Sequence, residues 1–542
     1  MASEASYLLS GFGTYTKEVL GRLHATGKYE IAEFASYAKI GDVRDNKIPW
    51  MFYPNAVDSK DPRWDTYQSK NTNQFGEWRF EAVCLDFKPD VVIDIRDPWM
   101  LIHECWSPVR PYFHHILMPT VDSAPQRDEW VDAFMTADRV FTYSDWGAKV
   151  LSKQSNGQCK LERPAYPGVN LNLFQPMDKK VCRKAMGIPE DAFIIGTVMR
   201  NQTRKLYPNL FRAFRKFLDT APKELADKTY LYAHTSYPDV GWDIPALLKE
   251  HDVGHKTFFT YIDRTNNKEF CSLFQDGLTY SPFSHGITAI MPTVTCGLSQ
   301  EQLAGVFNLF DVYVQYAICE GFGMPQAEAA ACGVPLMSVN YSAMEDLVRI
   351  TKGIPLKVGY LFREVGTNAD RVYPDDDYTA NAWIKFFSQS ESYRKDMGVT
   401  ARKAAEKHFN WDVTAKIWEE YLDRVQLTGL QGQWDTAPIR QWRTPPPKPP
   451  EGMTNYDFWT WCYNEILEQP NEFFSVKSLD IQKDLNYGAT RANNGMAPIN
   501  QEIAYKHILQ QTRNKNICEK IRTGQLKPGT EDFVQYAHAR MR

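Results

Sequence analysis

Short, uninterrupted apolar runs recur along the first 425 residues, and between them the apolar positions are spaced as on one face of a helix. Runs of this kind, rich in β-branched and aromatic residues, are typical of strands buried in a parallel sheet. Strands that alternate with helices predict a doubly wound α/β architecture. The clearest runs lie at residues 89–95, 114–119, 139–143, 193–199 and 310–316.

Two segments interrupt this alternation and predict the domain organisation. Residues 164–176 (PAYPGVNLNLFQP) carry Gly and Pro around short apolar groups, which suits a linker that packs while it turns. We therefore expect one α/β domain at residues 1–168 and a second at 169–425. Residues 441–452 (QWRTPPPKPPEG) predict a stiff polyproline linker, followed by an accessory helical module at 453–542.

Composition narrows the class of protein. The 542 residues are 43% hydrophobic, which is typical of a globular protein, and no stretch approaches the ~20 apolar residues of a membrane span. Ten scattered cysteines form no disulfide framework, and no secretory signal is visible, so we expect reduced thiols and a cytoplasmic location. The net charge of −4 gives no general reason to expect nucleic-acid or lipid binding, although a local patch could suffice.

The strongest chemical signal lies at residues 316–335 (YAICEGFGMPQAEAAACGVP). Glu320 and Glu328 are separated by seven residues, which include Gly321 and Gly323. The pattern predicts a strand, a glycine loop and a helix, so that backbone N–H groups and a helix N-terminus face an anion. One carboxylate can then meet a sugar ring and the other a ribose, with a diphosphate between them.

The string E-G-F-G-x-x-x-A-E-A-x-A-x-G-x-P resembles the E-x7-E signature of retaining GT-B glycosyltransferases, most closely family 4. The resemblance covers roughly residues 6–425. It implies a GT-B fold, in which two Rossmann-like domains face each other across a cleft; this chain adds a C-terminal extension. It also implies a nucleoside diphosphate sugar as donor, transfer with retention, and no cofactor or metal ion.

The same resemblance implies roles for particular residues. Arg200 and Lys205 follow the strand predicted at residues 193–199 and match the cations that hold the donor diphosphate. Glu320 would touch the sugar, beside the backbone of Gly321, Phe322 and Gly323, and Glu328 would bind the ribose hydroxyls. Gly11 and Gly13 match a glycine loop that faces the donor phosphate, between a short strand expected from Ser6 and a helix that ends near Leu23. All of these residues stand in the sequence at these positions.

The acceptor side is less specific. Asp97 and Asp122 follow two of the predicted strands, at the edge where open α/β sheets bind ligands, and we expect them to contact the acceptor. His103, His114 and His115 are better explained as structural residues.

An insertion at about residues 263–297 predicts a β-hairpin. Its Cys271, His285 and Cys296 have the wrong number and spacing for a zinc site, so we expect no metal there. The acidic residues 375–377 are expected to form a solvated loop.

We therefore expect a hexosyl- or pentosyltransferase whose acceptor is a glycan, a small molecule or a hydroxylated base in viral DNA. An epimerase or phosphorylase on the same fold, and a non-catalytic sugar-nucleotide-binding protein, remain open alternatives. The aromatic residues 456–461 (YDFWTW) have two interpretations: part of a module that docks a macromolecular acceptor, or a strap that folds back on the catalytic domains.

Overall fold

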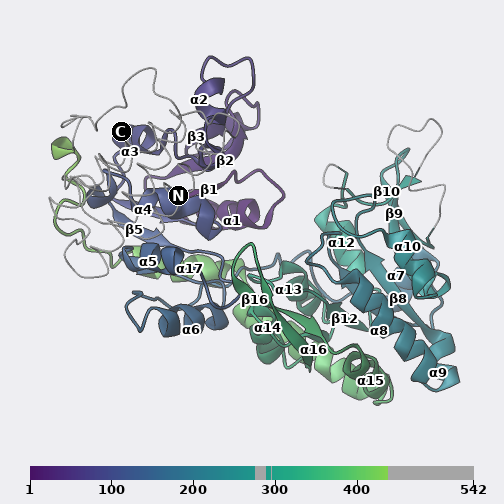
Figure 1. Ribbon diagram of the computed structural model, residues 1–542. Helices are drawn as coiled ribbons and strands as arrows, with labels where there is room; N and C mark the ends of the chain where they lie inside the picture. Colours follow the sequence, from purple (N-terminus) through teal and green to yellow (C-terminus); the bar gives the residue numbers. More distant parts are fainter. Residues whose placement is uncertain (275–288, 294–295, 438–542) are drawn as a thin grey trace, which may run out of the picture.

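The computed structural model describes residues 1–274, 289–293 and 296–437. The predicted polyproline linker and the accessory module lie outside the described residues, as does His285 of the insertion. Two α/β domains follow each other along the described chain, drawn from purple to blue and from teal to green in Figure 1. Within the described residues, no helix has the length and apolarity needed to cross a bilayer.

The first domain contains a six-stranded parallel sheet in the order β3-β2-β1-β4-β5-β6. Its strands are β1 (Ala2–Glu4), β2 (Ala32–Lys39), β3 (Met51–Ala56), β4 (Val91–Asp94), β5 (His114–Leu117) and β6 (Arg139–Val140). The main helices are α1 (Gly11–Ala25), α3 (Phe80–Phe87), α4 (Pro98–Cys105), α5 (Asp128–Met135) and α6 (Asp145–Gln154). Because each of β4, β5 and β6 is followed by a helix, the connections are the crossovers that a parallel sheet needs.

The beginning of this domain differs from the prediction. The first strand is Ala2–Glu4 rather than a segment that starts at Ser6, and it pairs in parallel with β2 and β4. Gly11 and Gly13 do not form a loop but the first turn of α1, whose N-cap Ser10 accepts a hydrogen bond from the Gly13 N–H. A Cβ at Gly13 would lie 2.6 Å from the Leu8 carbonyl oxygen, so glycine lets the helix start close to the preceding loop.

The second domain contains an eight-stranded sheet whose main path is β10-β9-β8-β7-β12-β13-β14, with β11 (Ala289–Ile290) also on β9. The parallel strands are β7 (Phe193–Val198), β8 (Thr229–His234), β9 (Thr257–Asp263), β12 (Val312–Gln315), β13 (Leu336–Val339) and β14 (Ile354–Leu356). Strand β10 (Lys268–Leu273) runs antiparallel to β9 and forms a hairpin at the start of the predicted insertion. There the Cys271 thiol donates to the Met186 carbonyl at 3.0 Å.

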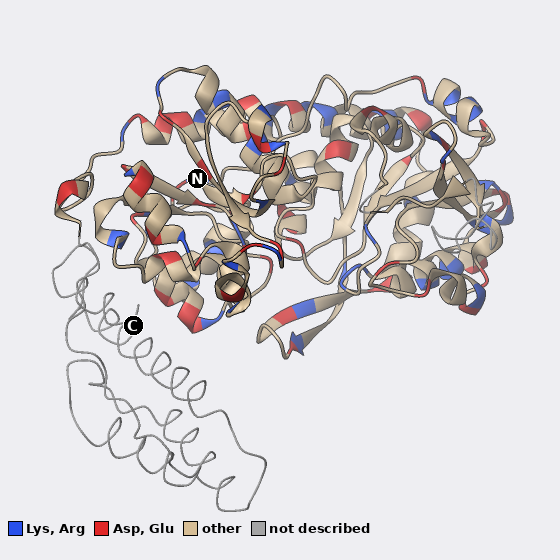
Figure 2. Ribbon diagram, turned by 90° about the horizontal axis from the view of Figure 1, so that it is seen from above, with Lys and Arg blue, Asp and Glu red and all other residues tan. Residues whose placement is uncertain are grey.

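The helices of the second domain include α8 (Tyr207–Thr220), α12 (Gln300–Phe307), α13 (Met324–Ala331), α14 (Ala343–Thr351), α15 (Asp376–Phe387) and α16 (Glu391–His408). A separate two-stranded sheet, β15 (Val358–Glu364) and β16 (Ala369–Pro374), follows β14. Basic and acidic residues are interspersed over both domains in Figure 2. Asp376 and Asp377 lie in the first turn of α15, capped by Asp375, rather than in the solvated loop that was expected.

Helix α17 (Trp411–Leu422) returns to the first domain, although the sequence placed it with the second. The fully buried Trp418 donates its indole N–H to the Tyr15 hydroxyl at 2.8 Å and stacks on Phe141 at a centroid distance of 4.3 Å. Arg22 of α1 pairs with Asp412 at 2.7 Å. The burial of large aromatic rings at this contact explains why the helix packs on α1.

Candidate active site

The glycine loop connects β12 to α13, as the sequence predicts, and it touches the first domain. Gly323 is the N-cap of α13 with φ +93°, a conformation that favours glycine. Gly321 faces Thr120, whose Cγ2 would lie 2.5 Å from a Cβ at that position. The two glycines are therefore required for different reasons: one for a left-handed turn, the other for close approach of the two domains.

Glu320 lies in this loop, only 6% exposed, and is surrounded by donors. Its carboxylate pairs with the Lys205 ammonium, with the Arg204 guanidinium at 3.0 Å, and accepts from the Gln315 amide at 2.6 Å. Its backbone N–H donates to the Ser342 hydroxyl at 3.0 Å. Burial alone would raise the pKa of Glu320, but the positive charges of Lys205 and Arg204 outweigh it and lower that pKa to about 2. The carboxylate is therefore ionised at neutral pH.

Lys205 and Arg204 are adjacent in sequence and both reach Glu320 because their backbone pairs with the start of the glycine loop. Lys205 forms an isolated antiparallel bridge with Ala317, and the Ile318 N–H donates to the Arg204 carbonyl at 3.0 Å. Burial lowers the pKa of Lys205 to about 8, even though Glu320 favours the charged form. Lys205 is the more buried of the two cations: its side chain is 9% exposed, and that of Arg204 is 43% exposed.

Arg200, which the sequence analysis paired with Lys205, does not join this group. Its guanidinium forms a two-pronged contact with Asp239, each N–O distance being 2.9 Å, and the side chain is 42% exposed. Arg204 takes the place beside Glu320 instead. The segment 200–205 contains two arginines, Arg200 and Arg204. The spacing of Arg200 and Lys205 did not show which arginine faces the glycine loop.

Glu328 lies in α13, and no ion pair with it is formed by the residues that the structure describes. The carboxylate makes no hydrogen bond with any residue in the described part of the chain, and burial raises its pKa to about 7. A desolvated carboxyl group without a hydrogen-bond donor is well suited to receive hydroxyl groups from a ligand.

No family model matches this chain. A D-inositol 3-phosphate glycosyltransferase from Nocardioides sp. is 24% identical over 280 residues, which are 52% of each chain. A protein of the same name from Streptomyces avermitilis is 25% identical over 283 residues, which are 52% of this chain and 50% of that protein. The chain thus spans about half the length of the curated relatives it matches.

Solved structures share the arrangement of both domains. The sucrose-phosphate synthase of Thermosynechococcus elongatus superposes with a TM-score of 0.54 at 17% identity, covering 77% of this chain and 93% of that one. The E. coli trehalose-6-phosphate structure bound with UDP-2-fluoro glucose gives 0.52 at 15% identity, covering 78% and 98%. This chain has the GT-B fold. The predicted fold class and the resemblance to family 4 glycosyltransferases are confirmed.

Asp97 and Asp122, the residues expected to contact the acceptor, both lie near the junction of the two domains. Asp97 is the N-cap residue of α4, and its pKa is raised to about 6, mainly by burial and further by Asp122 and Glu4, while Thr120 and Arg204 oppose the rise. Asp122 is tied across the junction: Arg371 of β16 pairs with it at 2.9 Å, and the Cys319 thiol donates to it at 3.2 Å. Asp97 alone of the two lacks an ion pair among the described residues.

The two GT-B domains are also joined around this junction by direct hydrogen bonds. Asp346 of α14 accepts from the backbone N–H of Trp146 at 2.7 Å, and Ala124 forms an antiparallel bridge with Asp370 at the start of β16. The Tyr341 hydroxyl of the second domain accepts from the Ala124 N–H of the first at 3.3 Å. The β15–β16 hairpin is thus part of the contact that positions Asp122.

His114 and His115 of β5 lie among buried structural groups. Fully buried Arg96 pairs with Asp94 and, at 2.6 Å, with Glu104. His115 lies 3.7 Å from Glu104, and burial holds the pKa of this histidine well below its usual value. The ring of His114 is 2.8 Å from the Tyr421 hydroxyl of α17. None of these four contacts involves Glu320 or Glu328.

Proposed function

We propose that this chain is a retaining glycosyltransferase that moves a sugar from a nucleoside diphosphate sugar to an acceptor. The observation that carries the proposal is the ion pairing of buried Glu320 with Lys205 and Arg204. Glu320 lies at the start of the glycine loop that leads into helix α13. The relatives named D-inositol 3-phosphate glycosyltransferase and a GT-B structure bound with UDP-2-fluoro glucose support the same chemistry. Retention is the stereochemistry that the resemblance to family 4 implies.

The arrangement suits departure of a nucleoside diphosphate. As the glycosidic bond breaks, the β-phosphate oxygen gains negative charge, and cations fixed in advance stabilise that charge without reorganising. Lys205 and Arg204 supply two cations, and the backbone N–H groups of Gly321, Phe322 and Gly323 at the N-terminus of α13 supply neutral donors. We assign the diphosphate to this group and propose that no metal ion is needed. Arg200 would join only if its contact with Asp239 opened on binding.

The two glutamates have different tasks in this proposal. Glu320 stays ionised and therefore orients the sugar and balances positive charge on the ring, but does not donate a proton. Glu328 accepts hydrogen bonds from the ribose hydroxyls. Asp97 lies on the acceptor side and accepts a hydrogen bond from the attacking hydroxyl group.

A panel of UDP, GDP and ADP sugars tests the proposal. The donor that raises the melting temperature most should also release its nucleoside diphosphate slowly in water and faster with an acceptor. NMR of the glycosylated product then reports the anomeric configuration, which should equal that of the donor. If no sugar nucleotide shifts the melting temperature or is turned over, the proposal is wrong; an inverted product would remove the retaining assignment only.

A further inference from the structure

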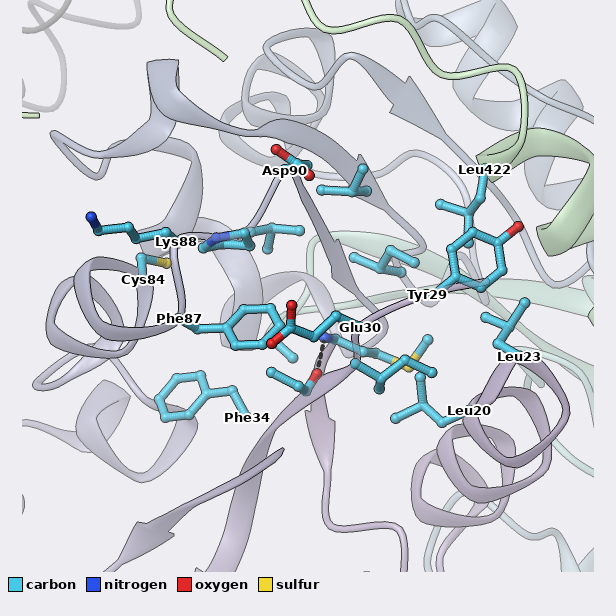
Figure 3. Close-up of a pocket in the computed structure, with 18 of the residues that line it drawn as sticks. Leu20, Leu23, Tyr29, Glu30, Phe34, Cys84, Phe87, Lys88, Asp90 and Leu422 are labelled. Atoms are coloured by element: carbon cyan, nitrogen blue, oxygen red, sulfur yellow. Dashed lines mark hydrogen bonds between the residues drawn. The ribbon is translucent and has the colours of Figure 1, made fainter. Parts of the chain in front are cut away.

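An apolar pocket of about 470 Å³ lies in the first domain, away from Glu320. It is formed where β1 and β4 begin, whereas Asp97 follows the opposite, carboxyl end of β4. Figure 3 shows Leu20 and Leu23 of α1, Phe87 of α3, Phe34 and Leu422 around it. The volume is in the range of pockets that hold organic ligands or large side chains. The pocket therefore lies at the other end of this sheet from Asp97.

The rim of the pocket carries two hydrogen-bond acceptors. Glu30 and Asp90 line it, and neither carboxylate makes a hydrogen bond with a residue in the described ranges. In Figure 3 the Glu30 side chain extends over the pocket beside Phe87. An apolar chamber with hydrogen-bond acceptors at its edge suits a group that has an apolar body and one N–H donor. The indole of tryptophan is such a group.

The chain itself passes this pocket as it leaves the described structure. Val425 and Leu427, just after α17, line the pocket. The chain then runs along residues 88–90, which also line the pocket. The Trp434 indole donates to the Pro89 carbonyl at 3.1 Å, and Asp435 pairs with Lys88 at 3.2 Å. The described chain therefore ends, at residue 437, next to the rim, and the 105 residues 438–542 continue from there.

We propose that the aromatic segment 456–461 (YDFWTW) of this same chain occupies the pocket and anchors the C-terminal region to the first domain. Trp459 and Trp461 place their indoles among the apolar side chains, with their N–H groups toward Glu30 and Asp90. The 19 residues from 437 to 456 span up to about 60 Å when extended, which leaves ample slack for a segment that starts beside the rim. Closing a loop of this length costs little more than closing a shorter one.

Photo-crosslinking in the full-length protein tests this contact. Phe87, or in a second variant the exposed Glu30, is replaced by p-benzoylphenylalanine, and cross-linked peptides are identified by mass spectrometry. We expect an intramolecular link to the peptide that contains residues 456–461. Trp459→Ala with Trp461→Ala should reduce its yield about tenfold or more, because aromatic anchors dominate such contacts. Trp442→Ala, a tryptophan outside the segment, should leave the yield unchanged, and the same crosslinker at Leu9, which is 99% exposed, should not capture this peptide.

The other results overturn the proposal. A link between two chains would assign the pocket to a second copy, and a non-protein adduct would assign it to a small apolar ligand. Links confined to peptides before residue 438, or no link from either position in protein with an unchanged melting temperature, would show that the segment does not occupy the pocket. None of these outcomes bears on the glycosyltransferase proposal, since nucleotide-sugar turnover is measured separately.

Discussion

The two domains place carboxyl groups in very different electrostatic surroundings where they meet. On the second domain, Glu320 is buried between Lys205 and Arg204, so its charge is more than balanced and its pKa is about 2. On the first domain, burial, and to a smaller extent the nearby carboxylates of Asp122 and Glu4, raises the pKa of Asp97 to about 6. The proposed donor side thus has fixed charges before any ligand arrives, whereas the proposed acceptor side has a carboxyl group that titrates just below neutral pH. In the proposed reaction, the charge that develops on the leaving group therefore meets a preorganised site.

The largest effect should come from removing the deepest cation. We expect Lys205→Ala to lower turnover at saturating donor by about 10²-fold or more, because a charge fixed beside the leaving diphosphate is lost. Steady-state kinetics measure it, with Lys205→Arg as the charge-preserving control. The pKa of about 8 adds a pH dependence: in the wild type, kcat/KM should fall as pH rises above about 8 and the ammonium loses its proton. Unchanged turnover in Lys205→Ala would separate Lys205 from the chemistry.

The next prediction separates the two arginines. Arg204→Ala should reduce kcat/KM by about 10²-fold, since its guanidinium lies 3.0 Å from Glu320. Arg200→Ala is the matched control and should change kcat/KM by less than about threefold, because a half-exposed pair with Asp239 is worth little. The reverse order of effects would mean that Arg200 leaves Asp239 to bind the donor, as the sequence resemblance implied.

These arginines show where sequence reasoning reached its limit. The glycines and small helix residues around Glu320 sufficed to predict strand, loop and helix, because each residue agrees with the local structure. Which of two neighbouring cations faces the loop depends on a partner, Asp239, that is distant in the sequence. The same holds for α17, whose helical spacing is clear but whose packing on α1 depends on tertiary contacts of Trp418. Strand β1 was misplaced because three residues carry too little pattern, and parallel pairing with β2 and β4 decides their conformation.

A smaller effect is expected at Glu328. Glu328→Gln should weaken donor binding by about 1–2 kcal/mol and leave kcat nearly unchanged, because an amide replaces a charged acceptor of ribose hydroxyls. In the wild type, donor affinity should increase as pH rises through about 7, where the buried carboxyl group becomes ionised and accepts more strongly. Calorimetric titration of both proteins between pH 6 and 8 measures this, and the variant should lack the rise in donor affinity through pH 7. A loss of kcat at unchanged donor affinity would give Glu328 a different role.

The smallest effect is expected on the acceptor side, at Asp97. Asp97→Asn should raise the acceptor KM about threefold to tenfold and leave donor affinity unchanged, because one hydrogen bond to a hydroxyl group is weakened while the donor site is intact. In the wild type, the carboxyl group is protonated below its pKa of about 6, so the acceptor KM should rise as pH falls through that value and the asparagine variant should not respond. Asp122→Asn is the matched control on the same side. Because Asp122 is bound to Arg371, its replacement should lower the melting temperature and change the acceptor KM little. If Asp122→Asn raised the acceptor KM while Asp97→Asn did not, the acceptor would approach along β16, and the contrast between a fixed donor side and a titrating acceptor side would no longer hold.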